Sequence, residues 1–305
     1  LGARVILFGD TYDEAYDHAL EIANQKKSIF IHPYDDPLVI AGQGTIAVEL
    51  LADCPNMDYV FIAVGGGGLI AGVASYIKSI NPNIKVIGVE PDNSACMTQA
   101  LAANKRIILN QVGIFADGFA VKQVGQEPFR IAKDDVDEMI TVSTDEICAA
   151  IKDIFDETRH IAEPAGALAT AGMKSYIRSH QLNNKTIVTI NCGANTNFDR
   201  LRHIAERAEI GENKEAIFSV EIPEKPGSFK TFCELLGKRA ITEFNYRYNT
   251  AKAAHIFVGI RLENGDSSKN DLLSLLTENH YPTIDLTDND VAKLHVRYMV
   301  GGHAT

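Results

Sequence analysis

The sequence lacks long apolar runs, paired cysteines and an excess of positive charge. It contains no apolar run of the roughly 18 residues that a membrane-spanning helix needs, and no charged-then-apolar leader typical of secretion. The five cysteines are scattered and never spaced as C-x-x-C, which argues against a zinc site or a disulfide framework. Basic residues number 29 against 40 acidic ones, so a nucleic-acid or anionic-membrane partner is not expected. We therefore expect a cytoplasmic protein that acts on small molecules.

Length and periodicity predict two domains. A chain of 305 residues, 46% apolar and 23% charged, suits two globular units. Through about residue 207, short β-branched runs alternate with longer stretches of helical period, which is typical of an α/β domain with a parallel sheet. Strands are expected at 3–8, 28–31, 58–64, 84–90 and 186–190, and helices at 12–26, 43–53, 67–79, 94–103, 144–158, 164–180 and 197–209.

The composition changes at residues 211–214, which are charged and contain glycine and are predicted to form a linker. Beyond it the expected order is β-α-β-β-α-β, which is the ferredoxin-like arrangement. The strands are expected at 215–222, 241–248, 254–262 and 283–286, and the helices at 228–237 and 268–278. The predicted domains are therefore 1–210 and 215–305.

Four consecutive glycines, Gly65 to Gly68, separate an apolar strand at 60–64 from the start of a helix. Because glycine has no Cβ, a phosphate can reach the backbone N–H groups here, and the positive end of the helix dipole faces the same point. No lysine or arginine lies in the loop, so amides alone would hold the anion. A turn without a ligand is the alternative, but the strand-loop-helix context favours a phosphate site.

The same loop also fits a second class of cofactor. Gly66-x-Gly68-x-x-Ala71 matches the loose dinucleotide fingerprint, and Glu90 ends the next predicted strand about 20 residues later, where a ribose-binding acid is expected. Against this, Pro91 follows Glu90 at once, and the fingerprint normally opens the first βα unit of its domain. A nicotinamide-dependent oxidoreductase is therefore kept as an alternative.

Two further segments are candidates for the same cleft. The turn at 191–195 follows the strand at 186–190, and turns at the carboxyl ends of parallel strands converge on the ligand. Cys192 is thus a candidate cofactor contact, although a buried small side chain is the simpler interpretation of a lone cysteine. Glu163 precedes a helix that begins with Pro164, where an acid that complements the helix dipole is a simpler interpretation than catalysis.

Six motifs occur in one order along the chain. They are His32-Pro-Tyr-Asp-Asp36, Gly42-Gln-Gly-Thr45, Val64-Gly-Gly-Gly-Gly-Leu69, Ala116-Asp-Gly-Phe-Ala-Val121, Glu163-Pro-Ala-Gly-Ala167 and Gly193-Ala-Asn-x-Asn-Phe198. In this order they resemble the pyridoxal-phosphate serine/threonine dehydratases of the tryptophan-synthase-β type. The tail adds Glu224-Lys-Pro-Gly-Ser228, Thr242-Glu-Phe-Asn-Tyr-Arg247 and Val296-Arg-Tyr-Met-Val-Gly-Gly302. It resembles the amino-acid-sensing regulatory domain of biosynthetic threonine deaminases. The resemblance covers essentially the whole chain and implies a fold type II catalytic part followed by an ACT-like domain.

This resemblance implies a cofactor and a reaction. Gly65 to Gly68 and Leu69 would bind the phosphate of pyridoxal 5'-phosphate, and Cys192 would face its ring nitrogen, where the family usually has a serine. A neutral partner leaves that nitrogen largely unprotonated, which favours prompt β-elimination. Gly118 and Glu163 would line the active site. The implied activity is that of a threonine ammonia-lyase of isoleucine biosynthesis, which forms 2-oxobutanoate and ammonia from L-threonine, with L-serine as a second candidate substrate.

The resemblance also implies regulation and assembly. The expected effectors are isoleucine and valine, with Tyr246 and Tyr248 as candidate contacts, and the expected assembly is a homotetramer. Some relatives hold a divalent ion through a glutamate and an aspartate. Here Glu90 is present but Cys96 stands in the place of the aspartate, and because a thiol is a poor ligand for magnesium or calcium we expect no metal.

Two segments typical of the family do not occur in this sequence. The Schiff-base lysine of the family lies in Ser-x-Lys-x-Arg-Gly, and Gly-Asn-His follows it; neither is present. We therefore expect a fragment that begins within the family's small domain, of which 1–27 is the remainder, and that is catalytically inert. The second half of the regulatory domain is also expected to be missing. A lysine-less pseudoenzyme that senses amino acids is a further alternative.

Overall fold

The computed structural model describes residues 2–9, 12–113, 115, 121–212, 214–248, 253–263 and 265–289. The chain separates into two compact units, Leu1–Ile204 and Ala205–Thr305. Within the described ranges, no helix is long and apolar enough to cross a membrane.

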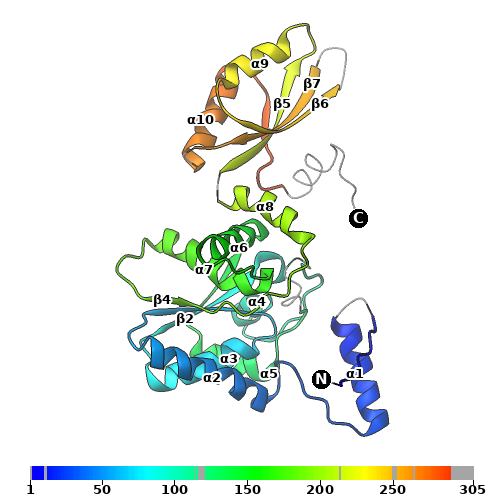
Figure 1. Ribbon diagram of the computed structural model, residues 1–305, viewed down its shortest axis with the longest axis vertical. Helices are drawn as coiled ribbons and strands as arrows, with labels where there is room; N and C mark the ends of the chain where they lie inside the picture. Colours follow the sequence, from blue (N-terminus) through cyan, green and yellow to red (C-terminus); the bar gives the residue numbers. More distant parts are fainter. Residues whose placement is uncertain are drawn as a thin grey trace. The chain divides into compact units, whose positions relative to one another are not determined.

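Among the described residues, the first unit holds a parallel sheet of four strands in the order β3-β2-β1-β4. The strands are β1 (Tyr59–Ala63), β2 (Lys85–Pro91), β3 (Glu138–Val142) and β4 (Ile187–Thr189). The helices are α1 (Tyr12–Lys26), α2 (Pro37–Asp53), α3 (Gly68–Ile80), α4 (Cys96–Ala102), α5 (Gln126–Asp135), α6 (Thr144–Thr158) and α7 (Pro164–His180), with a 3-10 turn η1 (Asp92–Ser94). Figure 1 shows α2, α3 and α5 on one face of the sheet and α6 and α7 on the other. This is the α/β architecture that the sequence predicts.

Two elements of the first unit were not predicted from the sequence, β3 and α5. β3 is an edge strand in which only Val142 is buried, so its apolar pattern is weak. α5 has the polar sequence Gln-Glu-Pro-Phe-Arg-Ile-Ala-Lys-Asp-Asp and contains Pro128 in its first turn. α2 also begins earlier than expected, at Pro37, because the Asp36 carboxylate accepts the N–H groups of Leu38 and Val39 and proline suits the first helical position.

The strands expected at 3–8 and 28–31 are wrong: both segments lack strand structure. Their apolar side chains face solvent, with Leu7 92% and Ile29 91% exposed. Apolar alternation measures only a propensity, whereas a strand forms when its backbone pairs with a neighbour. Among the described residues neither segment has such a neighbour.

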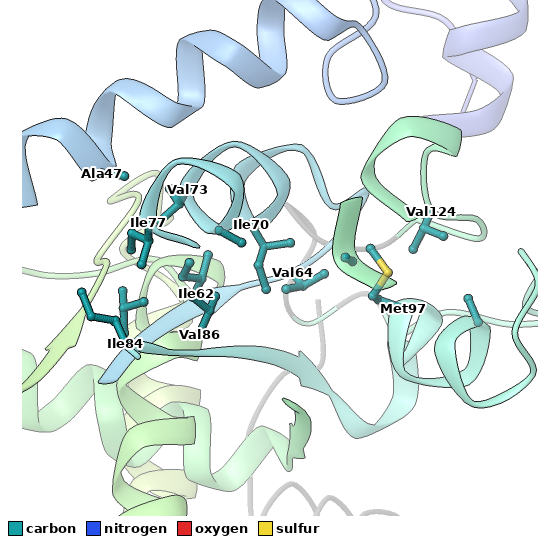
Figure 2. Packing of buried hydrophobic residues seen from close by; sticks show 14 of the residues in the cluster. Ala47, Ile62, Val64, Ile70, Val73, Ile77, Ile84, Val86, Met97 and Val124 are labelled. Atoms are coloured by element: carbon teal, nitrogen blue, oxygen red, sulfur yellow. The ribbon is translucent and has the colours of Figure 1, made fainter. Parts of the chain in front are cut away.

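One apolar core cluster of the first unit lies between the sheet and α3 (Figure 2). Ile62 and Val64 extend from the β1 side toward Ile70 and Val73 of α3, and all four are essentially inaccessible to water. α2 packs closely on α3 because Gly72 has no side chain, and a Cβ there would lie 2.2 Å from the Ile40 carbonyl oxygen. This packing fixes α3, and with it the loop that precedes α3.

The second unit contains an antiparallel sheet in the order β6-β7-β5-β8, as far as the chain is described. Its elements are β5 (Glu215–Pro223), α9 (Ser228–Leu236), β6 (Ile241–Tyr248), β7 (Ala253–Arg261), α10 (Gly265–Glu278) and β8 (Thr283–Asp285). The order β-α-β-β-α-β confirms the ferredoxin-like prediction. Phe218 and Ile256 from the sheet pack with Phe232 of α9 and Leu272 of α10 in one apolar cluster.

The expected linker at 211–214 is partly helical, and its described residues form backbone hydrogen bonds. Helix α8 (Arg200–Gly211) includes Gly211, and the N–H of Glu212 still donates to the Ala208 carbonyl. Lys214 donates its N–H to Glu209 and accepts the N–H of Leu262. Its charged and glycine-containing composition predicts a linker, whereas these backbone bonds attach the described residues of the segment to the second unit.

Candidate functional site

The glycine loop connects the centre of the parallel sheet to a buried helix. β1 ends at Ala63 and α3 begins at Gly68, with Gly67 as N-cap at φ +94°. The N–H of Val64 still donates to Val89 and that of Ala71 donates to Gly67. Within the described residues, the N–H groups of Gly65 to Gly68 have no hydrogen-bond acceptor. The loop therefore presents free amides at a helix N-terminus, which is the arrangement that binds a phosphate.

Glycine is required in this loop for a steric reason as well. A Cβ on Gly66 would lie 2.3 Å from Cγ of Tyr34, and a Cβ on Gly68 would lie 2.9 Å from the Tyr34 backbone. A Cβ on Gly67 would lie 2.7 Å from Cε of Met97, and its positive φ is strained for any other residue. Neighbouring segments thus hold the loop closely from outside.

The turn at 191–195 lies beside the glycine loop. β4 pairs with β1 in parallel, with Phe61 opposite Thr189, and the N–H of Ile190 donates to Phe61 at 3.3 Å. Both segments therefore leave the sheet at the carboxyl ends of adjacent strands. This is the edge at which open parallel sheets bind ligands.

Glu163 shapes that turn. Its backbone N–H donates to the Gly193 carbonyl at 3.0 Å, and its carboxylate accepts the N–H of Asn195 at 2.9 Å. Gly193 is required because a Cβ there would lie 2.1 Å from the Glu163 carboxylate. The sequence motif at 163–167 and the motif at 193–198 thus form one structural feature.

Cys192 carries a protonated thiol at neutral pH. Its Sγ lies 3.8 Å from the Ala165 carbonyl oxygen. Cys192 is exposed as a residue, so it is not the buried small side chain of the simpler interpretation. Partial desolvation of its thiol, reinforced by the Glu163 carboxylate, raises the pKa of Cys192 from its ordinary value of 9.0. The edge thus combines free backbone amides, which suit a phosphate monoester, with a neutral thiol, which suits an uncharged ring nitrogen. These residues fit pyridoxal 5'-phosphate.

Glu90, the candidate ribose-binding acid, is occupied by protein. Its side chain is fully buried, and its carboxylate accepts the N–H groups of Met97 at 2.7 Å and Thr98 at 2.8 Å and the Thr98 hydroxyl at 2.6 Å. Burial raises the pKa of Glu90 to about 6. This carboxylate caps α4, so the arrangement does not favour a dinucleotide.

Cys96 lies in the same region, at the start of α4. Burial raises the pKa of its thiol to about 11, and Sγ lies 3.3 Å from the Lys122 carbonyl oxygen. Among the described residues, no three His, Cys, Asp or Glu side chains gather as metal ligands would. The expectation that no metal binds stays a prediction.

The other candidate residues have mixed outcomes. Tyr246 lies on β6, is 42% exposed, and donates its hydroxyl to the Glu224 carboxylate. The backbone of Tyr248 belongs to β6, while Gly118 lies outside the described residues. Sequence reasoning did not identify Tyr34, whose only signal is its place in the motif at 32–36.

The comparisons with known proteins agree with this geometry. A family described as "Pyridoxal-phosphate dependent enzyme" matches residues 1–193, and the "C-terminal regulatory domain of Threonine dehydratase" matches residues 206–296. The chain is 51% identical to "L-threonine dehydratase biosynthetic IlvA" of Burkholderia multivorans, with 99% of this chain and 60% of that protein aligned. Its identity to "Threonine dehydratase biosynthetic, chloroplastic" of Arabidopsis thaliana is 46%, over 100% of this chain and 52% of that protein. The chain thus spans between about half and three-fifths of the length of these relatives.

Solved structures give the same result. Threonine deaminase isoform 2 of Solanum lycopersicum aligns with a TM-score of 0.67 and 46% identity, over 68% of this chain and 58% of that one. Maize serine racemase aligns with a TM-score of 0.61 and 29% identity, over 66% of this chain and 62% of that one. The nicotinamide alternative is not favoured. The chain belongs to the pyridoxal-phosphate-dependent enzymes of fold type II, with a threonine-dehydratase regulatory domain after its parallel sheet.

Proposed function

We propose that this chain supplies the cofactor-phosphate site and a regulatory unit of a threonine ammonia-lyase. The enzyme converts L-threonine to 2-oxobutanoate and ammonia in isoleucine biosynthesis, and L-serine is a second candidate substrate. One observation carries this proposal: the free amides at 65–68 and the neutral Cys192 thiol follow the carboxyl ends of two adjacent strands, so they lie at the same edge of the sheet. The names of the relatives support the choice of substrate.

Each residue of the site has a proposed task. The N–H groups of Gly65 to Gly68 and Leu69 bind the cofactor phosphate, because they stand at the positive end of α3. Cys192 faces the ring nitrogen as a neutral partner and leaves it unprotonated. Glu163 holds Cys192 in place through its bonds to the turn. When bound, pyridoxal phosphate supplies an electron sink for the α-carbon of an amino acid.

The two sequence domains have separate proposed roles. Residues 1–210 form a catalytic part in which 1–27 belongs to the small subdomain, and Gly118 lines the active site. Residues 215–305 form the first half of an ACT-like domain that binds isoleucine or valine near Tyr246 and Tyr248. The Schiff-base lysine is proposed to lie outside this sequence, and the enzyme to be a cytoplasmic homotetramer.

Binding of 4'-deoxypyridoxine 5'-phosphate tests the phosphate site. This compound has no aldehyde, so it forms no imine with surface lysines, and calorimetry with the 305-residue chain measures its affinity directly. We expect Gly67→Asp to abolish binding, because the carboxylate and the strained backbone both disturb the anion site. Gly227→Asp is the matched control, since Gly227 is also a helix N-cap, at φ +92°, in the second unit. Unchanged binding in Gly67→Asp overturns the proposed site.

The reaction is tested with a full-length protein of the same length as the relatives. We expect 2-oxobutanoate to form from L-threonine, detected as its hydrazone, and isoleucine to lower the rate. A full-length protein that binds isoleucine but forms no product would instead indicate the amino-acid-sensing pseudoenzyme.

A further inference from the structure

Two adjacent carboxylates, Asp35 and Asp36, cap two different helices. Asp36 caps its own helix, α2, by accepting the N–H groups of Leu38 and Val39 at 2.8 and 3.2 Å. Asp35 instead reaches α5, a helix that is distant in sequence. Its two carboxylate oxygens accept the N–H of Gln126 at 2.8 Å and the N–H of Glu127 at 2.9 Å. The N-cap residue of α5 is a glycine without a side chain, so Asp35 supplies the cap from outside.

That N-cap residue, Gly125, is also bonded to the glycine loop. Its N–H donates to the Gly66 carbonyl at 3.0 Å. A Cβ on Gly125 would lie 2.9 Å from Cγ of Asp35, so Asp35 and Gly125 are in direct contact. Pro128, in the first turn of α5, lies where it would be 2.8 Å from a Cβ on Gly67. The capped end of α5 therefore supports the glycine loop from its outer side.

The backbone bond to Gly66 determines where an amide of the loop points. The Gly66 carbonyl and the Gly67 N–H belong to one planar peptide group, and in a trans peptide they point in opposite directions. Holding the carbonyl toward Gly125 therefore aims the Gly67 N–H away from α5. A phosphate held by amides alone depends on such preset directions, because no side-chain cation in the loop compensates for a misaligned amide.

The segment that carries Asp35 is itself fixed. His32 Nδ1 accepts the N–H of Asp35 at 2.9 Å and that of Tyr34 at 3.3 Å. The ring of Tyr34 lies against Gly66, and its hydroxyl donates to the Gln123 carbonyl at 3.5 Å. The backbone of Asp35 is thus held by hydrogen bonds and by the packing of its neighbour Tyr34.

We propose that Asp35 is a positioning residue for the cofactor phosphate. It acts through the cap of α5 and the bond from Gly125 to Gly66, and it does not touch the phosphate. This inference rests on the proposed function of the glycine loop, and it assigns the aspartate of the 32–36 motif a role that the neighbouring Asp36 does not share.

The test compares two ligands and four proteins. The ligands are 4'-deoxypyridoxine 5'-phosphate and 4'-deoxypyridoxine, so the ratio of their affinities isolates the phosphate contribution. The proteins are the 305-residue chain and its Asp35→Ala, Asp35→Asn and Asp36→Ala variants. We expect Asp35→Ala to weaken the phosphorylated ligand about tenfold, or about 1.4 kcal/mol, and to leave the other ligand unchanged. Asp35→Asn keeps one acceptor oxygen and should therefore lose less affinity for the phosphorylated ligand than Asp35→Ala. Asp36→Ala removes an equivalent helix cap, that of α2, and should leave the ratio of the two affinities unchanged.

Each outcome has one meaning. A chain without any preference for the phosphorylated ligand contradicts the phosphate site and with it the role of Asp35. A clear preference that Asp35→Ala reduces no more than Asp36→Ala leaves the phosphate site intact and overturns the positioning role alone. If Asp35→Ala does not fold, Asp35→Asn decides the question through the same affinity ratio. Hydrogen exchange of the Gly125 amide, which should accelerate in either Asp35 variant, is the independent readout.

Discussion

Gly67 and Gly227 allow a direct measurement of how tightly the glycine loop is packed. Both are helix N-caps with nearly the same backbone, at φ +94° and φ +92°. An alanine at either position suffers the left-handed strain of about 1–2 kcal/mol. A Cβ on Gly227 meets nothing within 4 Å, whereas a Cβ on Gly67 would lie 2.7 Å from Met97 Cε and 2.8 Å from Pro128 Cβ.

The difference between the two substitutions gives the steric cost alone. Met97 Cε ends a flexible side chain and can move, but Pro128 Cβ belongs to a ring on α5 and cannot. Overpacking of this kind costs about 1–3 kcal/mol. We therefore expect Gly227→Ala to lower the free energy of unfolding of its unit by about 1–2 kcal/mol and Gly67→Ala to lower that of its unit by about 2–5 kcal/mol.

Urea unfolding followed by hydrogen-exchange mass spectrometry is the assay. Peptides from β1 report on the first unit and peptides from β5 on the second, which keeps the two values separate when the units unfold in different transitions. A loss for Gly67→Ala equal to or smaller than that for Gly227→Ala refutes the packing of Met97 and Pro128 against the loop.

Three further predictions concern ionisable groups near the sheet edge. Burial raises the pKa of Glu90 from 4.5 to about 6, so the folded chain binds this proton more tightly than the unfolded chain. Protonation of Glu90 therefore stabilises the folded chain fully below pH 4.5, and about 2 kcal/mol of this stabilisation is lost as the pH rises through 6. Urea unfolding midpoints measured at about pH 4.5 and about pH 7 should differ less in Glu90→Gln than in the unchanged chain, because the variant lacks this ionisation. The same pH dependence in both proteins contradicts the assignment to Glu90. Glu163→Ala removes the carboxylate that accepts the Asn195 N–H. Because such a hydrogen bond is worth about 1 kcal/mol, hydrogen exchange of the Asn195 amide should become about fivefold faster, whereas Glu163→Gln keeps an acceptor and should keep the slow exchange. Equal exchange rates in the two variants contradict the role of Glu163 in the turn. The raised pKa of Cys192 predicts that its alkylation by iodoacetamide rises with pH to a midpoint above 9.0, and a midpoint at or below 9.0 contradicts its desolvation.

Local sequence was sufficient for much of the fold. The glycine loop, α3 and the ferredoxin-like order follow from patterns within a few residues, and the structure confirms them. β3 was missed because an edge strand with one buried residue has little apolar signal. The segments at 3–8 and 28–31 show the converse limit, since their apolar patterns predict strands that need a partner to form.

Local sequence likewise predicts some residues of the candidate site but not the contacts between them. The strand-glycine-helix pattern predicts the loop at 65–68, and the turn after the strand at 186–190 makes Cys192 a candidate, whereas Glu163 is a candidate through the family resemblance alone. None of these patterns shows that Glu163 bonds to the turn that contains Cys192. The role of Asp35 in supporting the glycine loop is even harder to predict from the sequence, because its carboxylate caps a helix that is distant in sequence. Such contacts are set by tertiary packing and leave no local pattern.

Amide chemical shifts of the 305-residue chain, followed by NMR during titration with 4'-deoxypyridoxine 5'-phosphate, test the central claim most directly. We predict the largest changes at the N–H groups of Gly65 to Gly68 and of Leu69, with smaller changes at Cys192. Unphosphorylated 4'-deoxypyridoxine should not produce the changes at 65–69. Largest changes elsewhere, or equal changes with both compounds, would contradict phosphate binding by the glycine loop.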